Sequence, residues 1–256
     1  MSDQSVAIVT GGASGIGLGI ASTLIAEGYD VFVLDNDLQH VDEYNASHPL
    51  SRARVCDVSD ASAVVTEIDG VFHVAGRIDL LVNNAGTSGP TAPVEAVDPS
   101  EWQRTLDVGL TGAFNVTRSV APIMKSQGSG VIINVASNAG LMGCPNRSPY
   151  VAAKWALIGL TKTWAMELGP HKVRVNALCP ASVEGERIEA VMARDAEERG
   201  VSVSDIRQSS LQSFTRVEDI ASMVCYLASD AAVRISGQAI GLDGHTETLG
   251  NPLGAL

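Results

Sequence analysis

Three residues of this 256-residue chain have types and a spacing suited to moving a proton: Ser137, Tyr150 and Lys154. Tyr150 and Lys154 are four residues apart, so on a helix they share a face, where the ammonium group can act on the phenol. A tyrosine holds its proton up to about pH 10, and a fixed neighbouring cation favours the phenolate, which makes the side chain usable as an acid or base near neutrality. The pair alone is also typical of an ordinary helix surface, so its meaning depends on the rest of the chain.

The composition is that of a globular protein, with 45% hydrophobic residues, 25 glycines and 10 prolines. The formal charge of −12 and the pI of about 4.7 exclude a basic surface for nucleic acid or for an anionic membrane. No apolar run approaches the roughly 18 to 20 residues of a membrane-spanning helix. Residues 1–4 carry no basic group ahead of the first apolar run, which argues against a signal peptide.

The cysteines are scattered along the chain at Cys56, Cys144, Cys179 and Cys225. They show no paired spacing of the kind that binds a metal, so we predict no metal site. We interpret them as reduced thiols of a cytoplasmic protein.

Short apolar runs typical of buried strands alternate with helical patterns along the whole chain. The expected strands are 6–10, 31–34, 54–56, 79–82, 131–135, 173–178 and 238–242. The expected helices are 18–27, 60–74, 98–126, 148–168 and 217–227. Residues 183–213 are charged and irregular apart from an amphipathic piece near Met192, and form a variable substrate loop. The alternation predicts an α/β fold: a single doubly wound, Rossmann-type domain of residues 1–256, with a seven-stranded parallel sheet and helices on both faces.

The first expected strand runs into a glycine-rich turn, residues 11–17, and then into a helix. Such a turn lets the backbone approach a pyrophosphate, which rests on the helix N-terminus. Asp35 follows the second strand, 18 residues after Gly17, where a dinucleotide fold places the carboxylate that accepts hydrogen bonds from the adenosine ribose. The alternatives are a tight turn with glycines for geometry only and a plain strand-end cap.

Ligands of doubly wound sheets bind outside the carboxyl ends of the strands. The candidate residues all follow expected strands; they are the glycine turn, Asp35, Asp57, residues 83–86, Ser137 and Pro180. This convergence indicates one ligand site at one edge of the sheet.

In these residues the sequence resembles the short-chain dehydrogenase/reductase family over nearly its whole length. The resemblance is carried by the run from Thr10 to Gly17, by the Asn-Asn-Ala-Gly tetrapeptide 83–86, and by Ser137 with Tyr150 and Lys154. It implies that Tyr150 is the general acid/base, that Ser137 holds the substrate oxygen, and that Lys154 binds the nicotinamide ribose and lowers the tyrosine pKa.

The resemblance also implies a set of cofactor-binding residues. These are Thr10, Gly11, Ser14, Gly15, Ile16, Gly17, Asp35, Asp57, Val58, Asn83, Ala85, Gly86, Tyr150, Lys154, Pro180 and Val183. Asp57 and Val58 are expected to flank the adenine. Asp35 would repel the extra phosphate of NADP, and the places where NADP-preferring relatives carry a basic residue hold Asn36 and Ser14, so the expected cofactor is NAD.

Two departures from the family pattern stand out. Gly109 occupies the place of an asparagine thought to hold a water that links the lysine to solvent. Three interpretations are open. Water takes the place of the asparagine side chain and still relays protons between Lys154 and solvent; the proton relay is impaired; or the glycine has no connection with the chemistry. After the sixth strand, residues 180–185 lack the usual threonine, which removes its hydroxyl from the cofactor contacts.

On the substrate side we expect Arg147, Arg187, Asn138 and Cys144. Two guanidinium groups near a site can clamp an anion bidentately, which predicts a carboxylate, phosphate or sulfonate on the substrate. The alternative is that Arg147 pairs with Glu184 or Glu186, or faces water.

The predicted function is NAD-dependent hydride transfer to or from a small-molecule alcohol or ketone. The alternatives are a cofactor-binding or sensing protein with impaired catalysis, favoured by Gly109, and a dihydrodiol or sugar-alcohol dehydrogenase. Trp155, Leu160 and Trp164 belong to the core or to a subunit interface, and we expect a homotetramer.

Overall fold

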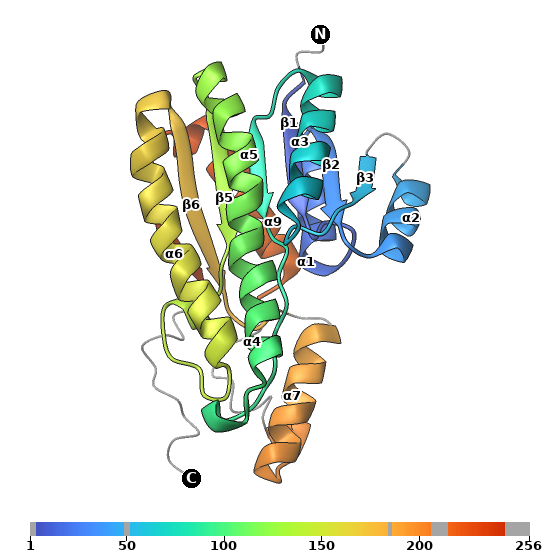
Figure 1. Ribbon diagram of the computed structural model, residues 1–256, viewed down its shortest axis with the longest axis vertical. Helices are drawn as coiled ribbons and strands as arrows, with labels where there is room; N and C mark the ends of the chain where they lie inside the picture. Colours follow the sequence, from blue (N-terminus) through green and yellow to red (C-terminus); the bar gives the residue numbers. More distant parts are fainter. Residues whose placement is uncertain (1–3, 49–51, 184–185, 206–214, 244–256) are drawn as a thin grey trace.

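The computed structural model describes residues 4–48, 52–183, 186–205 and 215–243. Seven strands form one sheet in the order β3-β2-β1-β4-β5-β6-β7, and every neighbouring pair is parallel (Figure 1). The strands are β1 (Val6–Thr10), β2 (Asp30–Asp35), β3 (Arg52–Val55), β4 (Leu80–Asn83), β5 (Gly130–Val135), β6 (Val173–Pro180) and β7 (Ala239–Leu242). The strand order reverses between β1 and β4, which is where such a sheet opens a crevice for a ligand.

Helices cover both faces of the sheet, so its central strands are buried on both sides and mostly apolar. One face carries α3 (Ala61–Ala75), α5 (Gly112–Gln127) and α6 (Ser148–Leu168); the other carries α1 (Gly15–Ala26) and α9 (Val217–Ala228) (Figure 1). Alternate residues of β1 supply the two cores: Ala7 and Val9 pack towards α1 and α9, Val6 and Ile8 towards α3 and α5. The predicted doubly wound α/β fold is confirmed.

Two further helices lie beyond the carboxyl ends of the strands. They are α4 (Pro99–Leu106) and α7 (Glu186–Arg199), at the bottom of the view in Figure 1. Within the segment expected to be irregular, residues 186–199 form a helix of about four turns, longer than the amphipathic piece expected near Met192.

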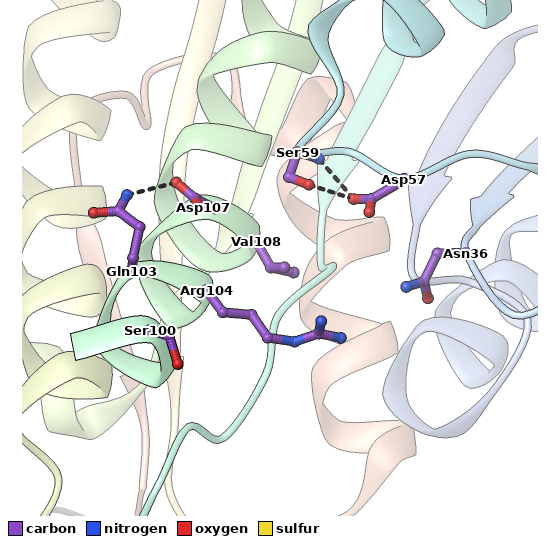
Figure 2. A pocket seen from close by; sticks show the side chains of 8 residues that line it. All are labelled: Asn36, Asp57, Ser59, Ser100, Gln103, Arg104, Asp107 and Val108. Carbon is purple, nitrogen blue, oxygen red and sulfur yellow. Dashed lines mark hydrogen bonds between the residues drawn. The ribbon is translucent and has the colours of Figure 1, made fainter. Parts of the chain in front are cut away.

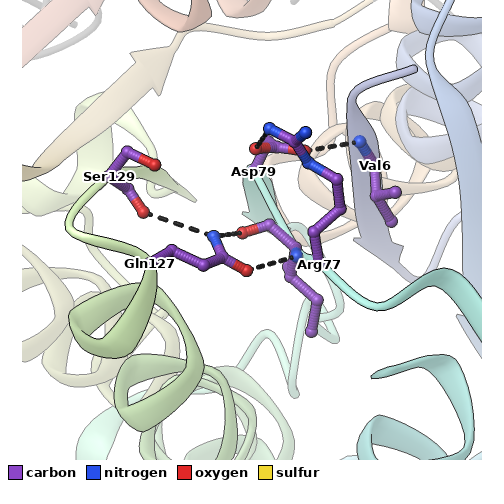
Figure 3. Close-up of polar contacts among 6 residues, drawn as sticks. Val6, Arg77, Asp79, Gln127 and Ser129 are labelled. Carbon is purple, nitrogen blue, oxygen red and sulfur yellow. Dashed lines mark hydrogen bonds and ion pairs between the residues drawn. The ribbon is translucent and has the colours of Figure 1, made fainter. Parts of the chain in front are cut away.

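At the amino-terminal ends of the strands, a polar network joins β1, β4 and β5 (Figure 3). The Asp79 carboxylate accepts a hydrogen bond from the Val6 amide at 2.8 Å. It also accepts hydrogen bonds from Nε and Nη2 of Arg77, each at 2.8 Å. The Gln127 side chain pairs with the backbone of Ile78, donating to its carbonyl at 2.8 Å and accepting from its amide at 2.9 Å. Side chains thus satisfy backbone groups where the strands begin.

One helix was not expected from the sequence, α2 (Leu38–Ser47), which packs beside β3. Its N-cap is Asp37, whose carboxylate accepts a hydrogen bond from the His40 amide at 3.1 Å. Only Val41 and Tyr44 are buried in it, so the apolar periodicity was too sparse to indicate a helix. Strand β3 begins two residues earlier than expected because Arg52 is still paired with Phe32.

The long helix expected over 98–126 is interrupted by a π-helical turn, η2 (Asp107–Thr111), between α4 and α5. The turn contains Gly109, which is buried. The apolar residues of this region are only partly internal: Val116 is fully buried, whereas Phe114 is 44% exposed. The extra residue of the π turn rotates the two helical segments relative to each other, so one periodicity does not describe both.

Within the described ranges, no helix is both long and apolar enough to cross a lipid bilayer.

Candidate active site

The glycine turn after β1 is built for a close approach of backbone to backbone. Gly11 has φ +58° and Gly15 φ +52°, a region that residues with a side chain rarely adopt. A Cβ on Gly17 would lie 2.0 Å from the Gly11 carbonyl oxygen, so only glycine lets α1 start this close to the turn. The predicted strand–turn–helix context is present.

The N-terminus of α1 is open to solvent. Ser14 is its N-cap, Gly15 and Ile16 follow, and both Ser14 and Gly15 are exposed. The first turn has no acidic residue, and no side chain caps it. Free amides at the positive end of a helix suit a pyrophosphate, so this part of the chain fits the phosphates of a dinucleotide.

Asp35 ends β2 next to this turn. Its carboxylate is buried and accepts hydrogen bonds from the Ala13 amide at 3.1 Å and the Asp37 amide at 3.2 Å. These two bonds fix the orientation of the carboxylate and leave further acceptor positions on both oxygens.

A pocket of about 470 Å³ opens beside Asp35, between the ends of β2 and β3 and helix α4 (Figure 2). Its lining residues are Asn36, Asp57, Ser59, Ser100, Gln103, Arg104, Asp107 and Val108. Arg104 extends from α4 into this space, and Asp57 is held by the amide and hydroxyl of Ser59 at 2.9 and 2.7 Å. The pocket combines one apolar wall, one cation and several amide and carboxylate groups, which suits an adenosine.

Val58 does not line this pocket. It is buried against Gly112 of α5, and its carbonyl accepts a hydrogen bond from Asn115 at 3.0 Å. The apolar wall comes instead from Val108, a residue the sequence did not single out.

The tetrapeptide 83–86 at the end of β4 is hydrogen-bonded to the glycine turn, mainly through Asn84. Its side-chain amide donates to the carbonyls of Thr10 at 3.0 Å and Gly11 at 2.9 Å. The Thr10 hydroxyl accepts from the amides of Asn84 and Ala85, each at 3.0 Å. Asn84 belongs to the tetrapeptide 83–86, but the sequence analysis does not include it among the site residues. Two consecutive asparagines at the end of a strand were the feature that could have indicated its role.

The side chain of Asn83 points away from the cofactor region into the core. It is buried and donates to Asn134 at 2.9 Å and to Thr117 at 3.0 Å. Gly86 lies close to the candidate catalytic lysine, since a Cβ there would be 3.7 Å from Lys154 Nζ.

Lys154 and Tyr150 lie together on the first turns of α6, as their spacing predicts. Lys154 is 5% exposed, and its ammonium donates to the Val135 carbonyl at the end of β5 at 2.8 Å. The Lys154 Nζ atom is 5.7 Å from the centroid of the Tyr150 ring. A cation held this way favours the phenolate form of its neighbour.

Ser137 is buried at the end of β5, where its hydroxyl donates to Asn138 Oδ1 at 3.2 Å and accepts from the Ala139 amide at 3.2 Å. The short turn η3 (Asn138–Gly140) packs on α6, and a Cβ on Gly140 would meet the Lys154 carbonyl at 2.9 Å. The turn therefore holds Ser137 and Asn138 at the end of the sheet where Tyr150 and Lys154 lie.

Arg147 precedes α6 as its N-cap residue. Its guanidinium carbon lies 5.0 Å from the centroid of the Tyr150 ring, and its Nη2 donates to the Ser88 carbonyl at 2.8 Å. No carboxylate of the described residues lies within ion-pair distance of it. The alternative partner Glu184 lies outside the described residues, and the side chain of Glu186, at the start of α7, is not described either.

The other residues expected on the substrate side are less defined. Cys144 is exposed in the loop before α6. Arg187 lies in the first turn of α7, and its side chain is outside the described part. Trp164 belongs to the core at 7% exposure, whereas Trp155 is 50% exposed.

The segment after β6 is hydrogen-bonded to the end of β7. Pro180 ends β6, the Ala181 amide donates to the Leu242 carbonyl at 3.2 Å, and Val183 forms an isolated bridge with Thr215. Residues 180–183 thus lie at the same end of the sheet as Ser137.

Gly109 of the π turn packs against α6. Outside its own helical turn, a Cβ on it would meet only Ala153 Cβ within 4 Å, in ordinary contact at 3.6 Å. The position therefore has room for a Cβ.

The sequence matches the family model for short chain dehydrogenase over residues 5–206. The chain belongs to the short-chain dehydrogenase family. Members of this family are oxidoreductases that use a nicotinamide cofactor.

Individual short-chain dehydrogenases share about a third of their residues with this chain. It is 35% identical to a 3-oxoacyl-(acyl-carrier-protein) reductase of Thermotoga maritima, over 94% of this chain and 97% of that protein. It is 34% identical to a D-beta-hydroxybutyrate dehydrogenase of Rhizobium meliloti, over 93% of this chain and 96% of that protein.

Solved structures of the same family agree in fold. NAD+-bound xylitol dehydrogenase superposes with a TM-score of 0.88 at 32% identity, covering 94% of this chain and 98% of that one. An actinorhodin polyketide ketoreductase variant with NADPH gives a TM-score of 0.90 at 31% identity, covering 94% and 97%. The neighbours thus include both nicotinamide cofactors.

Proposed function

We propose that this protein is an NAD-dependent oxidoreductase that transfers a hydride between the nicotinamide and an alcohol or carbonyl substrate. The observation that carries the proposal is the buried Lys154 ammonium, held by the Val135 carbonyl at 2.8 Å and placed 5.7 Å from the Tyr150 ring. A buried charge costs free energy unless it is paired, and this one is directed at a phenol in a strand-end crevice.

In this mechanism Tyr150 exchanges a proton with the substrate oxygen, giving it up during reduction and taking it during oxidation. The Ser137 hydroxyl donates to the same oxygen once it turns from Asn138 towards substrate. Lys154 keeps the phenolate accessible near neutral pH. The bound nicotinamide supplies the hydride chemistry, and the α1 N-terminus, Asp35 and the adenosine-side pocket orient it.

The preference for NAD rests on Asp35. Its buried carboxylate would meet the ribose hydroxyls of NAD favourably and would repel the additional phosphate of NADP. Ser14 and Asn36, the flanking positions, are uncharged. Arg104 is a cation in the same pocket, but Asp57 and Asp107 line that pocket too, so its local charge does not favour a phosphate.

A sugar alcohol or a dihydrodiol is a narrower substrate proposal, and the likeness to a xylitol dehydrogenase supports a polyol. An anionic substrate finds less support, because Arg147 already donates to Ser88 and stacks on Tyr150.

The second candidate function is a cofactor-binding protein without turnover. Gly109 favours it, since the family's asparagine is missing from the π turn. The joint presence of Ser137, Tyr150 and Lys154 favours the enzyme, because binding alone does not need all three. We propose that water occupies the space beside Gly109 and maintains the proton path.

A cytoplasmic homotetramer completes the proposal. Trp155 on α6 is 50% exposed, Met166 on the same helix 80% and Phe114 on α5 44%, which is consistent with a subunit interface on these helices. Light scattering on the purified protein measures the assembly.

The function is tested by a screen of alcohols with NAD and NADP, and of ketones with NADH and NADPH. The proposal expects turnover with at least one alcohol or ketone and a higher kcat/KM with NAD or NADH. Comparable or better turnover with NADP would contradict the cofactor assignment. NADH binding without any turnover would support the binding protein.

A further inference from the structure

The residue that begins α6 breaks the rules of helix capping. Arg147 is the N-cap, with φ −128° and ψ 29°, and its side chain makes no cap hydrogen bond. N-caps favour small side chains that accept hydrogen bonds, and a positive charge at a helix N-terminus opposes the helix dipole. Positions at which local preference is violated are often functional.

The guanidinium of Arg147 is fixed rather than free in solvent. Its Nη2 donates to the Ser88 carbonyl at 2.8 Å, and the Ala92 amide donates to the Asn146 carbonyl at 2.9 Å. The loop that follows β4 and the start of α6 are thereby joined at two points. No acceptor among the described residues serves the buried Nε of Arg147.

This fixed cation lies on the ring of the candidate catalytic tyrosine. The guanidinium carbon is 5.0 Å from the Tyr150 ring centroid, closer than the Lys154 ammonium at 5.7 Å. A guanidinium keeps its charge throughout the pH range of enzymes, and it is attracted to a ring face, more strongly when that ring carries a negative charge.

The elements packed around the start of α6 contribute both uncharged and charged groups. From the end of β5 comes the uncharged hydroxyl of Ser137, and from the loop after β4 the Ser88 carbonyl. Helix α4 and η2 also pack on α6, and their charged side chains are Glu101, Arg104 and Asp107. Glu101 is exposed, and Arg104 and Asp107 line the adenosine-side pocket.

We propose that Arg147 is a positioning residue that acts through Tyr150: a second fixed cation that, with Lys154, stabilises the phenolate and sets the pH at which the tyrosine exchanges its proton. The inference rests on the proposed role of Tyr150 as acid/base. It assigns to Arg147 a task other than contact with an anionic substrate.

The test compares Arg147→Gln, Arg147→Lys and wild type in the pH dependence of kcat/KM for alcohol oxidation. Loss of the cation should raise the pH midpoint by about half to one unit, because the free energy of one cation–ring contact corresponds to a pKa shift of about that size. Arg147→Lys restores most of the shift. Lys125→Gln, in the last turn of α5 at the opposite edge of the sheet, removes one charge and leaves the midpoint unchanged.

A spectroscopic titration keeps the test independent of turnover. The chain has four tyrosines, and subtracting the ultraviolet absorbance of Tyr150→Phe from that of each protein isolates the tyrosinate signal of Tyr150. The midpoint of that signal moves up in Arg147→Gln in the same way. If Arg147→Gln does not fold, Arg147→Met takes its place, because its unbranched stem keeps the packing on the ring.

An unchanged midpoint in both measurements would overturn the inference, even if turnover falls, because loss of the Ser88 bond alone lowers activity without moving a pH midpoint. A rise in KM confined to anionic substrates, without a shift, would also overturn it. Absence of turnover in wild type, with a shifted tyrosinate midpoint in Arg147→Gln, would instead defeat the proposed function and leave the electrostatic role in place.

Discussion

At the scale of single residues, the burial of Lys154 is what supports a catalytic role for the Tyr-x-x-x-Lys pair, which is a weak pattern by itself. A Tyr-x-x-x-Lys pair on an exposed helix face leaves the ammonium in water, where its effect on the phenol is screened. Here the ammonium is 5% exposed and donates to the Val135 carbonyl. Burial fixes its position and raises its influence on Tyr150, because charges interact more strongly away from solvent.

Asp35 carries the prediction on cofactor choice. In Asp35→Ser the ribose loses a charged acceptor, so kcat/KM with NAD should fall by about 10- to 100-fold, the range of a hydrogen bond to a charged group. The ratio of kcat/KM for NADP to that for NAD should rise, and steady-state kinetics with both cofactors measures it. Asp37→Ser is the matched control: its carboxylate is exposed, caps α2, and serine keeps a capping side chain. An unaltered ratio in Asp35→Ser would remove Asp35 from cofactor selection.

Gly109 carries the prediction on the proton path. The only contact of a new Cβ is an ordinary one with Ala153 at 3.6 Å, so Gly109→Asn should fold and bind NADH as wild type does. If protons pass through the space beside Gly109, the asparagine alters the pH dependence of turnover. We expect such a change in the kcat profile. The same rate and the same profile in both proteins would exclude a relay at this position.

At the scale of elements, the glycine turn and the start of α1 form one unit with Asn84. The amide of that side chain bonds the Thr10 and Gly11 carbonyls, and Gly17 leaves room for the Gly11 carbonyl. The turn is therefore held in shape by a neighbouring strand end before any cofactor arrives, which is the kind of preorganisation that binding requires.

Gly17→Ala tests this unit. A methyl group 2.0 Å from the Gly11 oxygen forces the turn or the helix to move, which should lower the free energy of unfolding by about 3 kcal/mol or more and abolish NADH binding. Denaturant unfolding and NADH fluorescence measure the two effects. Gly169→Ala, at the C-cap of α6 with φ −54°, meets no atom outside its own helix within 4 Å and should raise stability by about 0.5 to 1 kcal/mol with normal binding. Wild-type binding by Gly17→Ala would refute the role of the close approach.

The elements also show where sequence reasoning reaches and where it stops. Helix α6 begins and ends at the predicted residues, because Pro149 marks its first turn and Gly169-Pro170 its end. The π turn in the helix after β4 was missed, because one inserted residue changes the apolar pattern too little to detect. The apolar wall of the pocket beside Asp35 was also missed, because Val108, which lines it, lies in that π turn.

At the scale of the whole molecule, stability and chemistry occupy opposite edges of one sheet. The carboxyl edge holds Asp35, Ser137, Tyr150 and Lys154. The amino edge holds Asp79 and Gln127, which satisfy the backbone of β1 and the start of β4 (Figure 3). The alternation of strands and helices predicted that the candidate residues gather at the carboxyl ends of the strands, but it did not predict the network at the amino ends. Hydrogen bonds between elements of the candidate site, such as the one from Lys154 to the Val135 carbonyl, involve backbone atoms and therefore cannot be predicted from residue types.

Gln127→Leu tests the separation of the two edges. The leucine leaves the amide and carbonyl of Ile78 without their partner, so the free energy of unfolding should fall by about 1 to 3 kcal/mol. Turnover at a temperature where the protein is folded should remain that of wild type. Gln39→Leu, which removes an exposed bond to Glu43 on α2, should change stability by less than about 0.5 kcal/mol. A loss of kcat in folded Gln127→Leu would show that the edges are coupled.

The central claim is that Tyr150 exchanges the proton of the reaction, and Tyr150→Phe tests it most directly. On the alcohol that gives the highest turnover with NAD, the variant should lose at least about 100-fold in kcat, the scale of general acid–base catalysis. NADH should bind the variant and wild type with affinities within about twofold, because the ring remains in place. Wild-type turnover by Tyr150→Phe would contradict the claim.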